Sequence, residues 1–508
     1  MELEFERDTI ACWETVADTT LCQEETLESI VPDACPDILR IIDVCGQAVL
    51  TGKQAREGAA EVNGAVRAVI LYQPEDGTGL RRMEVSLPFT CQTEAPGLTA
   101  QGFVASSPRL RCAEARMLNP RKVLLRVDLA VDVTACQPKE RPVCCAVANP
   151  EANGICQRQY QGEDYQLSSV QEKPFTFSER IRFQSGAAEG AQVLAAWAQP
   201  LCTESRLIGS KLIFKGTVEL QLLIQEPGGG QTASQESLPF SQVLEMEGSG
   251  EDTDCQVSAV VTEFQWHPWE EDPRELEVTL ELLAQAQVHS RRPVRLLQDL
   301  YSTGWRMDVD RELQELCRLE DASVRTQSVR ELLETGEAVR SVVESRLSLG
   351  QVRQSREGDE LVLAADAFVT VLYLDENEQV QCVKKSLTAA CRVNCSEAAK
   401  CTCRCSAPGE VFAAPAAGGV EVRFQTEFHC MLTVKSVVPC VCSAQFGEAR
   451  GSGETARPSV VLRLAGPGEG LWDIAKSYGT TIEQIVQANE LESEETPLGK
   501  MLLIPRVR

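Results

Sequence analysis

Apolar and polar residues alternate along most of this chain, which is the period-two pattern of half-buried β-strands. One such strand, rich in β-branched residues, recurs at 62–74, 214–227 and 364–373. In the first two copies a glycine stands near the start of this strand, and the tripeptide Leu-Pro-Phe follows at 87–89 and 238–240. Each copy closes with another alternating strand, at 122–131, 276–282 and 420–425.

These copies predict three domains that are mainly β. They are spaced by about 150 residues, which is the size of a domain rather than of a solenoid repeat. We expect β-sandwiches at 1–145 and 165–300, and a more diverged third one at 338–446. A proline cannot donate to a strand ladder, so Leu-Pro-Phe predicts an edge strand or the start of a strand. The shared glycine predicts a close backbone approach or a bulge.

The stretches between the copies have other patterns. Residues 137–170 are rich in Pro, Gly, Asn and Gln and predict a linker. Residues 305–337 predict a helical connector, because their apolar residues recur at helical spacing. That apolar stripe comprises Leu313, Leu316, Cys317, Leu319, Val324, Val329, Leu332 and Leu333. Residues 447–458 contain three glycines and predict a flexible linker to a terminal domain at 459–508.

The terminal domain predicts the order strand, turn, helix, helix and strand. Val460, Leu462 and Leu464 alternate with Val461 and Arg463, as in a short half-buried strand. A glycine-rich turn follows at 466–470, and helical spacing begins at 471. A helix end is expected at 478–479, a cap at Thr480 or Thr481 for a second helix that closes at 489, and a second strand at 501–505.

This pattern resembles a LysM module, and the matching residues are Leu471, Trp472, Ile474, Ala475, Tyr478, Gly479, Thr480, Thr481, Asn489, Gly499, Ile504 and Pro505. The resemblance implies a small βααβ (α+β) fold that binds N-acetylglucosamine-containing glycan through two loops. Carried over by position, the loop residues are Gly468, Glu469, Gly470 and Leu471, and Asn489, Glu490, Leu491, Pro497, Leu498 and Gly499.

The first of these loops departs from the family. It is usually Gly-Asp-Thr-Leu, whereas here it is Gly-Glu-Gly-Leu, at 468–471. Two polar groups that could orient a sugar are therefore changed, which favours a protein partner in the same groove. Trp472 stands at a helical position where we expect a core residue rather than a stacking platform for a sugar.

The first copy carries a second resemblance. Residues 30–42, IVPDACPDILRII, are similar to the opening of the SPOCS domain of spore-forming Firmicutes. The strand ending at Leu71-Tyr72 and the Leu-Pro-Phe at 87–89 fit the same domain, and 297–302 resembles the segment that follows the second such domain. Repeated SPOCS domains followed by one LysM resemble the SipL family, whose members interact with the coat-anchoring ATPase SpoIVA.

That resemblance implies a non-enzymatic adaptor of spore coat assembly. Its expected location is the mother-cell cytoplasm, at the forespore surface, and its expected partners are a SpoIVA-type ATPase and other coat proteins. The alternative is a peptidoglycan-binding cell-wall protein, which would need export and a catalytic domain. A third hypothesis, a metal or redox protein, would rest on the cysteines.

Charge and composition narrow the partners. The net charge of −26 argues against nucleic acid, whose phosphates the surface would repel, and against an anionic membrane. No apolar run approaches the ~18 residues of a membrane span. The first residues lack the basic end and apolar core of a secretion signal, so we expect a cytoplasmic protein whose 22 cysteines are reduced.

One group of cysteines is dense enough to suggest chemistry. Cys391, Cys395, Cys401, Cys403 and Cys405 fall within fifteen residues, and Cys430, Cys440 and Cys442 follow. Such thiols could hold zinc or an iron–sulfur cluster, although paired C-x-x-C knuckles are missing. They could also form oxidative cross-links. The spacing of 401, 403 and 405 puts their side chains on one face of a strand, which favours a buried stripe.

Catalytic motifs are missing from the sequence. Gly466, Gly468 and Gly470 imitate a dinucleotide-binding turn, but the third glycine is one position early and only about forty residues follow. The three histidines, His267, His289 and His429, stand in no motif with a nucleophile. We therefore expect no enzymatic activity and no cofactor.

Overall fold

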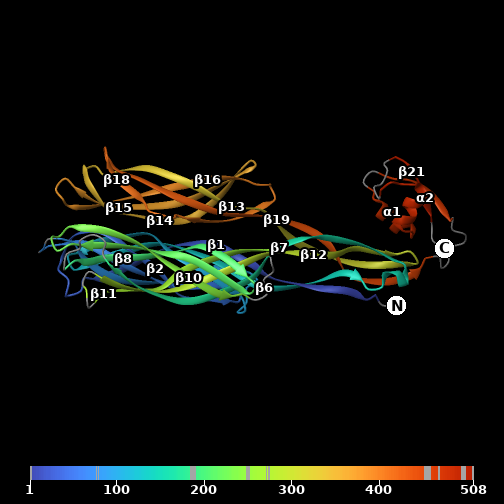
Figure 1. The fold of residues 1–508 in the computed structure, drawn as a ribbon, viewed down its shortest axis with the longest axis horizontal. Coiled ribbons are helices and arrows are strands. Elements are labelled where there is room, and N and C mark those ends of the chain that lie inside the picture. Colours follow the sequence, from blue (N-terminus) through green and yellow to red (C-terminus); the bar gives the residue numbers. More distant parts are fainter. Residues whose placement is uncertain are drawn as a thin grey trace.

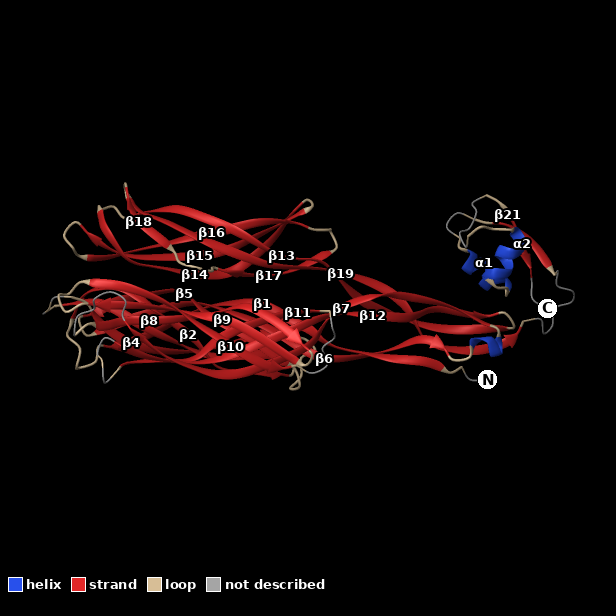
Figure 2. Ribbon diagram, viewed as in Figure 1, coloured by secondary structure: helices blue, strands red, loops and turns tan. Residues whose placement is uncertain are grey.

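The structure is a computed structural model that describes residues 3–75, 77, 79–182, 190–246, 252–269, 272, 275–450, 459–466, 469–493 and 499–505. Strands dominate it, and the two α-helices lie in the terminal module (Figure 2). The strands of copy one are β1 (Phe5–Ile30), β2 (Ile38–Arg56), β3 (Ala59–Pro74), β4 (Arg81–Glu94), β5 (Phe103–Asn119) and β6 (Lys122–Val147).

The other two copies repeat this order. Copy two has β7 (Ile155–Arg182), β8 (Gln192–Ile208), β9 (Lys211–Gln225), β10 (Gln231–Glu245), β11 (Thr253–Pro268) and β12 (Glu275–Ser302), preceded by the short 3-10 helix η1 (Pro150–Asn153). Copy three has β13 (Trp305–Glu334), β14 (Val339–Glu357), β15 (Glu360–Asp375), β16 (Val380–Asn394), β17 (Ala399–Ser406), β18 (Phe412–Ala416) and β19 (Gly419–Ala449).

Each copy folds the same way. A long first strand pairs antiparallel with the last strand, which also pairs with the strand before it, or with β17 in copy three: β1-β6-β5, β7-β12-β11 and β13-β19-β17. The three strands between form a second sheet: β2-β3-β4, β8-β9-β10 and β14-β15-β16. Alternate residues of β3 and β6, such as Val66 and Leu125, share one buried core. The predicted mainly β, multidomain architecture is confirmed.

The glycine and the Leu-Pro-Phe of the repeat pack against each other. Gly64 lies directly opposite Phe89, and Gly216 directly opposite Phe240. A Cβ at either glycine would collide with the phenylalanine ring and with a neighbouring carbonyl oxygen, so the ring fills the space that the missing side chain leaves. In copy three the corresponding opposed pair is Ala365 and Ala389. Copy three thus has neither the glycine nor the phenylalanine of this motif, which accounts for its weaker sequence similarity to the other two copies.

The predicted helical connector at 305–337 is wrong. This segment is β13, a strand of 30 residues that pairs with β19 along its length. Leu313 and Val324, two members of the supposed apolar stripe, are 72% and 53% exposed. The strand forms because β19, about a hundred residues later in the chain, satisfies its backbone groups, and that pairing overrides local helical spacing.

The predicted linker at 137–170 is also wrong over most of its length. β6 runs on to Val147 and β7 begins at Ile155, so only 148–154 connect the first two copies. The strands of copy two therefore begin ten residues before the expected boundary at 165, and those of copy three begin at Trp305 rather than 338. Of the predicted linker at 447–458, residues 451–458 lie outside the described residues.

The three copies pack together (Figure 1). Copies one and two share a six-stranded sheet in the order β11-β12-β7-β1-β6-β5. Copy three meets them at a buried charge cluster, in which Asp43 of copy one pairs with Arg346 and, at 2.9 Å, with Lys384. The guanidinium of Arg346 also lies over the ring of Trp197 from copy two, 5.1 Å from its centroid. One cation thus contacts both other copies.

The longest strands extend beyond the sandwiches and form a stalk that reaches the terminal module (Figure 1). Apolar side chains from all three copies pack along it, including Val143 of β6, Leu296 of β12 and Val438 of β19. The stalk therefore holds the module away from the sandwiches.

Candidate functional site

The terminal module has the predicted order of elements. Its strands β20 (Val460–Leu464) and β21 (Met501–Pro505) pair antiparallel, and between them lie α1 (Leu471–Tyr478) and α2 (Ile482–Asn489). Gly479, in the left-handed region at φ 68°, ends α1, and Thr481 caps α2 by accepting a hydrogen bond from the Gln484 amide at 3.2 Å. The buried core is made of Ala465, Leu471, Trp472, Ile474, Ala475, Ile485, Leu502 and Ile504.

The described residues of the first predicted loop have structural roles. The Glu469 carboxylate pairs with Arg463 at 2.5 Å and accepts a hydrogen bond from the Gly466 amide at 3.3 Å. Gly470 is the N-cap of α1, and Leu471 is 2% exposed. Gly468 lies outside the described residues. The one charged side chain of this loop is therefore already engaged within the module.

The described residues of the second predicted loop also make contacts within the module. The Asn489 amide donates 2.7 Å hydrogen bonds to the carbonyl oxygens of Ile485 and Leu503 and accepts one of 2.7 Å from the Leu503 amide. It thus ties α2 to β21. Glu490 is the exposed C-cap of α2, at φ 50°, Leu491 packs on the core, and Gly499 is exposed at φ 73°. Pro497 and Leu498 lie outside the described residues.

The outer face of the two-stranded β20–β21 sheet is apolar and exposed, which the sequence analysis missed. Val460, Leu462 and Leu464 are 47%, 65% and 59% exposed, and Met501 and Leu503 are 61% and 41% exposed. Leu462 lies opposite Leu503, and Leu464 opposite Met501, so the five side chains form one patch, which we call the sheet face. Val461, by contrast, packs on the core. The available signal was that β21 is apolar on both faces, and that in β20 the residues that alternate with Val461 and Arg463 are all apolar.

The opposite side of the module is covered by the protein's own stalk. Asp299, near the end of β12, accepts a 2.8 Å hydrogen bond from Trp472 Nε1 and pairs with Lys476 Nζ at 2.7 Å. It also pairs with Arg311 of β13. Burial by itself would raise the pKa of Asp299, but Lys476, Trp472 and Arg311 outweigh it and hold the pKa below its ordinary value.

Two further contacts complete this dock. Tyr301 packs edge-on against the Trp472 ring, with centroids 5.0 Å apart, and its hydroxyl donates to the Thr480 carbonyl oxygen at 2.8 Å. Arg450, just after β19, donates to the Lys476 carbonyl oxygen at 3.0 Å. Trp472 is therefore buried between the module's core and the stalk. The segment 297–302, singled out in the sequence only by resemblance, is the platform that receives α1.

The predicted cysteine site lies in the core of copy three. Cys395 and Cys430 are buried, and Cys391, Cys401, Cys403 and Cys405 pack partly buried against the same cluster. Burial raises the pKa of Cys391 to about 11 and of Cys405 to about 12. Among the residues that the structure describes, no group of His, Cys, Asp and Glu side chains is arranged to hold a metal ion.

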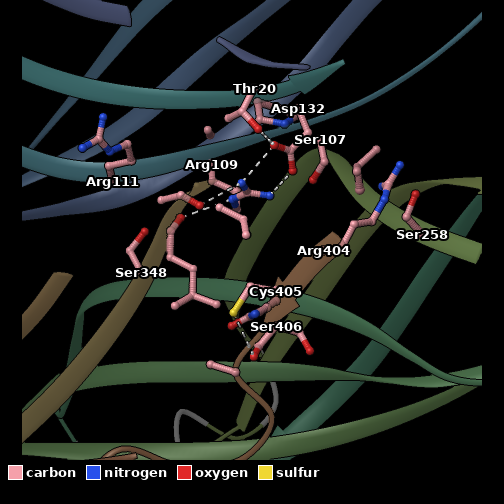
Figure 3. A pocket seen from close by; sticks show the side chains of 18 of the residues that line it. Thr20, Ser107, Arg109, Arg111, Asp132, Ser258, Ser348, Arg404, Cys405 and Ser406 are labelled. Carbon is pink, nitrogen blue, oxygen red and sulfur yellow. Dashed lines mark hydrogen bonds and ion pairs between the residues drawn. The ribbon is translucent and has the colours of Figure 1, made fainter. Parts of the chain in front are cut away.

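A large cavity of about 1580 Å³ opens between the three copies (Figure 3). Arg109 pairs there with Asp132, which also accepts a 2.7 Å hydrogen bond from Thr20. On the opposite wall Ser406 Oγ lies 3.2 Å from His429 Nε2, and Glu427 lies 3.6 Å from the same nitrogen. A catalytic relay uses both ring nitrogens of the histidine, so this arrangement is not one.

His289, for which the sequence analysis found no catalytic motif, stacks on Tyr165 with ring centroids 5.4 Å apart. Burial lowers its pKa to about 4, which keeps the imidazole neutral at pH 7.

No helix in the described part of the chain is long and apolar enough to cross a membrane.

Comparison with known families agrees with this division of the chain. Residues 466–505 match the LysM domain, and residues 37–111 and 191–267 match the SipL, SPOCS domain. The two SPOCS matches cover β2 into β5 of copy one and β8 to β11 of copy two, which are corresponding elements. Neither family is an enzymatic domain. A search of curated proteins finds no match.

Proposed function

Because the chain is SipL-like, with two SPOCS domains and a C-terminal LysM domain, we propose that it is a non-enzymatic adaptor of spore coat assembly. In this proposal the LysM docks onto a SpoIVA-type coat-anchoring ATPase at the forespore surface, in the mother cell. The SPOCS sandwiches supply surfaces for other coat proteins.

The sheet face of the LysM carries the proposal. Exposed apolar side chains scattered singly are normal on a protein, but a contiguous apolar patch is typical of a site for a protein partner. Here five apolar side chains stand side by side on a two-stranded sheet, with Leu462 at the centre of β20. They lie on the side of the module away from its dock, where a partner has access.

The polar side chains of the loops are already engaged within the module, which favours a protein ligand over a glycan. Sugar recognition needs hydrogen-bonding groups that are free to orient hydroxyls, together with an aromatic platform. In this module Glu469 and Asn489 are engaged internally, and Trp472 is buried in the dock. The LysM match keeps peptidoglycan binding as the second candidate.

The test is a titration of full-length protein against a purified SpoIVA-type ATPase, with purified sacculi assayed in parallel. Leu462→Arg places a charge in the centre of the sheet face and should weaken ATPase binding at least about tenfold. The matched control is Val243→Arg, because Val243 is an apolar residue of β10 that is 43% exposed.

Unchanged ATPase binding by Leu462→Arg would remove the sheet face as the docking site. Strong sacculus binding by the wild type, without ATPase binding, would replace the adaptor with the glycan-binding alternative.

A further inference from the structure

Two cysteines of copy three face each other across a strand pair. Cys403 of β17 lies directly opposite Cys430 of β19, and their sulfur atoms are 3.8 Å apart. We propose that Cys403 and Cys430 are a site of oxidative modification, and that a peroxide joins them in an intramolecular disulfide. This site goes beyond the proposed function and does not depend on it.

The backbone already has the geometry that a disulfide requires. Directly opposed residues of an antiparallel pair have Cα atoms roughly 4.5–5.5 Å apart, and a disulfide spans Cα separations of roughly 4.4–6.8 Å. The bond therefore needs side-chain rotation alone. The neighbouring cysteines of β17 do not have such a partner, since Cys401 lies opposite Leu432 and Cys405 opposite Phe428. Register thus places one pair of cysteines directly opposite each other, while Cys401, whose thiol also hydrogen-bonds to Cys430, lies diagonally across the ladder.

The local chemistry favours reaction. The hydrogen bonds shared within this cluster lower the pKa of the Cys430 thiol and, together with burial, raise the pKa of the Cys403 thiol. The thiolate is the form that reacts, so Cys430 is the more reactive sulfur of the pair. One sulfur of the pair takes an oxygen atom from the peroxide, whose O–O bond breaks, giving a sulfenic acid and one water. The other thiol attacks that sulfur, the S–O bond breaks, and the departing hydroxide takes the thiol proton as a second water.

A small oxidant has a route to the pair. Cys401, Cys403 and Cys405 line the cavity between the three copies, whose volume is about 1580 Å³. Cys405 is labelled in Figure 3. Cys430 is 4% exposed and lies behind this wall. A peroxide is small enough to enter such a space, whereas burial shields the Cys430 sulfur from the thiol of a second protein. The geometry therefore favours a bond within the chain over a bond between chains.

The bond would fasten an edge strand. β17 has eight residues and lies at the end of the β13-β19-β17 order, so among the described residues its ladder is made with β19. A disulfide at its centre prevents β17 from separating from β19. Oxidation should therefore slow hydrogen exchange in β17 relative to the reduced protein.

The experiment uses full-length reduced protein treated with hydrogen peroxide. Free thiols are then alkylated in acid, and the chain is digested with trypsin without reduction. Cleavage after Lys400, Arg404, Arg423 and Lys435 yields peptides 401–404 and 424–435. We expect these two peptides to appear covalently joined, and to separate on reduction.

Variants assign the sulfur atoms, because peptide 401–404 contains two cysteines. Cys401→Ser should keep the link and Cys403→Ser should lose it. Exposed Cys22 reports that oxidant was present. The proposal is overturned if wild-type Cys430 stays fully alkylated while Cys22 is oxidised, or if the link survives in Cys403→Ser. The wild-type measurement stands even if a variant fails to fold.

Discussion

The two sides of the LysM module differ in what covers them. On the α1 side the stalk supplies Asp299 and Tyr301, which make directed polar contacts with Lys476, Trp472 and Thr480. The sheet face has five apolar side chains that are 41% to 65% exposed. A directed polar contact fixes one orientation, whereas an apolar patch contributes binding energy wherever a complementary surface meets it.

The two sides of the module, residues 459–508, therefore have different roles. The α1 side holds the module to its own chain, and the sheet face is presented outward. Substitutions on the two sides should therefore have distinct effects on the stability of the docked module, and we order them from the largest to the smallest.

Trp472→Ala should cause the largest loss, because this side chain belongs to both the module's core and the dock. Removing a buried tryptophan costs about 3 kcal/mol or more. Hydrogen exchange of the α1 and α2 amides in the full chain should then approach that of unprotected amides. Trp269→Ala is the control, since Trp269 packs on Arg180 in copy two. Unchanged α1 protection in Trp472→Ala would contradict this account of the module.

Asp299→Asn should release the dock while leaving the module folded. A hydrogen bond to a charged group contributes about 2 kcal/mol, and the substitution removes the charge that Lys476 and Arg311 share. Exchange should accelerate in α1 but not in the core strands of the module. The control is Asp473→Asn, because Asp473 is an exposed carboxylate of the same helix. Equal effects of the two substitutions would count against the dock.

The dock should also weaken in acid. Because the pKa of Asp299 is lowered in the folded chain, its contribution is fully present above the unfolded-state pKa, near roughly 4. It is lost as the pH falls through the lower folded value. Exchange of the α1 amides, corrected for intrinsic rates, should thus rise below about pH 4 in the wild type. Asp299→Asn should not show this transition.

Tyr301→Phe should have a smaller effect. It removes the hydroxyl that donates to the Thr480 carbonyl oxygen but keeps the edge-on contact with Trp472, so the expected cost is about 1 kcal/mol. The Thr480–Gln484 region should exchange slightly faster. A loss as large as that of Asp299→Asn would mean that the aromatic contact had been disturbed as well.

Leu462→Asn should have the smallest effect on stability, within about 0.5 kcal/mol, because the side chain is 65% exposed. Its effect should appear in partner binding instead. A large loss of stability would show that the sheet face is covered within the chain, and the contrast between the two sides of the module would fail.

The cysteines of copy three show what their spacing in the sequence could predict and what it could not. Residues 401, 403 and 405 were expected on one face of a strand, and all three pack against the core of copy three. Spacing could not select a pair among them. Only the register of β17 against β19 places Cys430 opposite Cys403 rather than opposite its neighbours.

By itself the sequence determined the local structure: the alternating strands such as β3 and β9, and the capped helices α1 and α2. These depend on residues a few positions apart, so their signal lies within a short window. The tertiary structure decided that β13 is a strand, which side of β20 is buried, and that Asp299 receives Lys476. Each depends on a partner brought close by folding: β19 for β13, the helices for β20, and for Asp299 a residue 177 positions later.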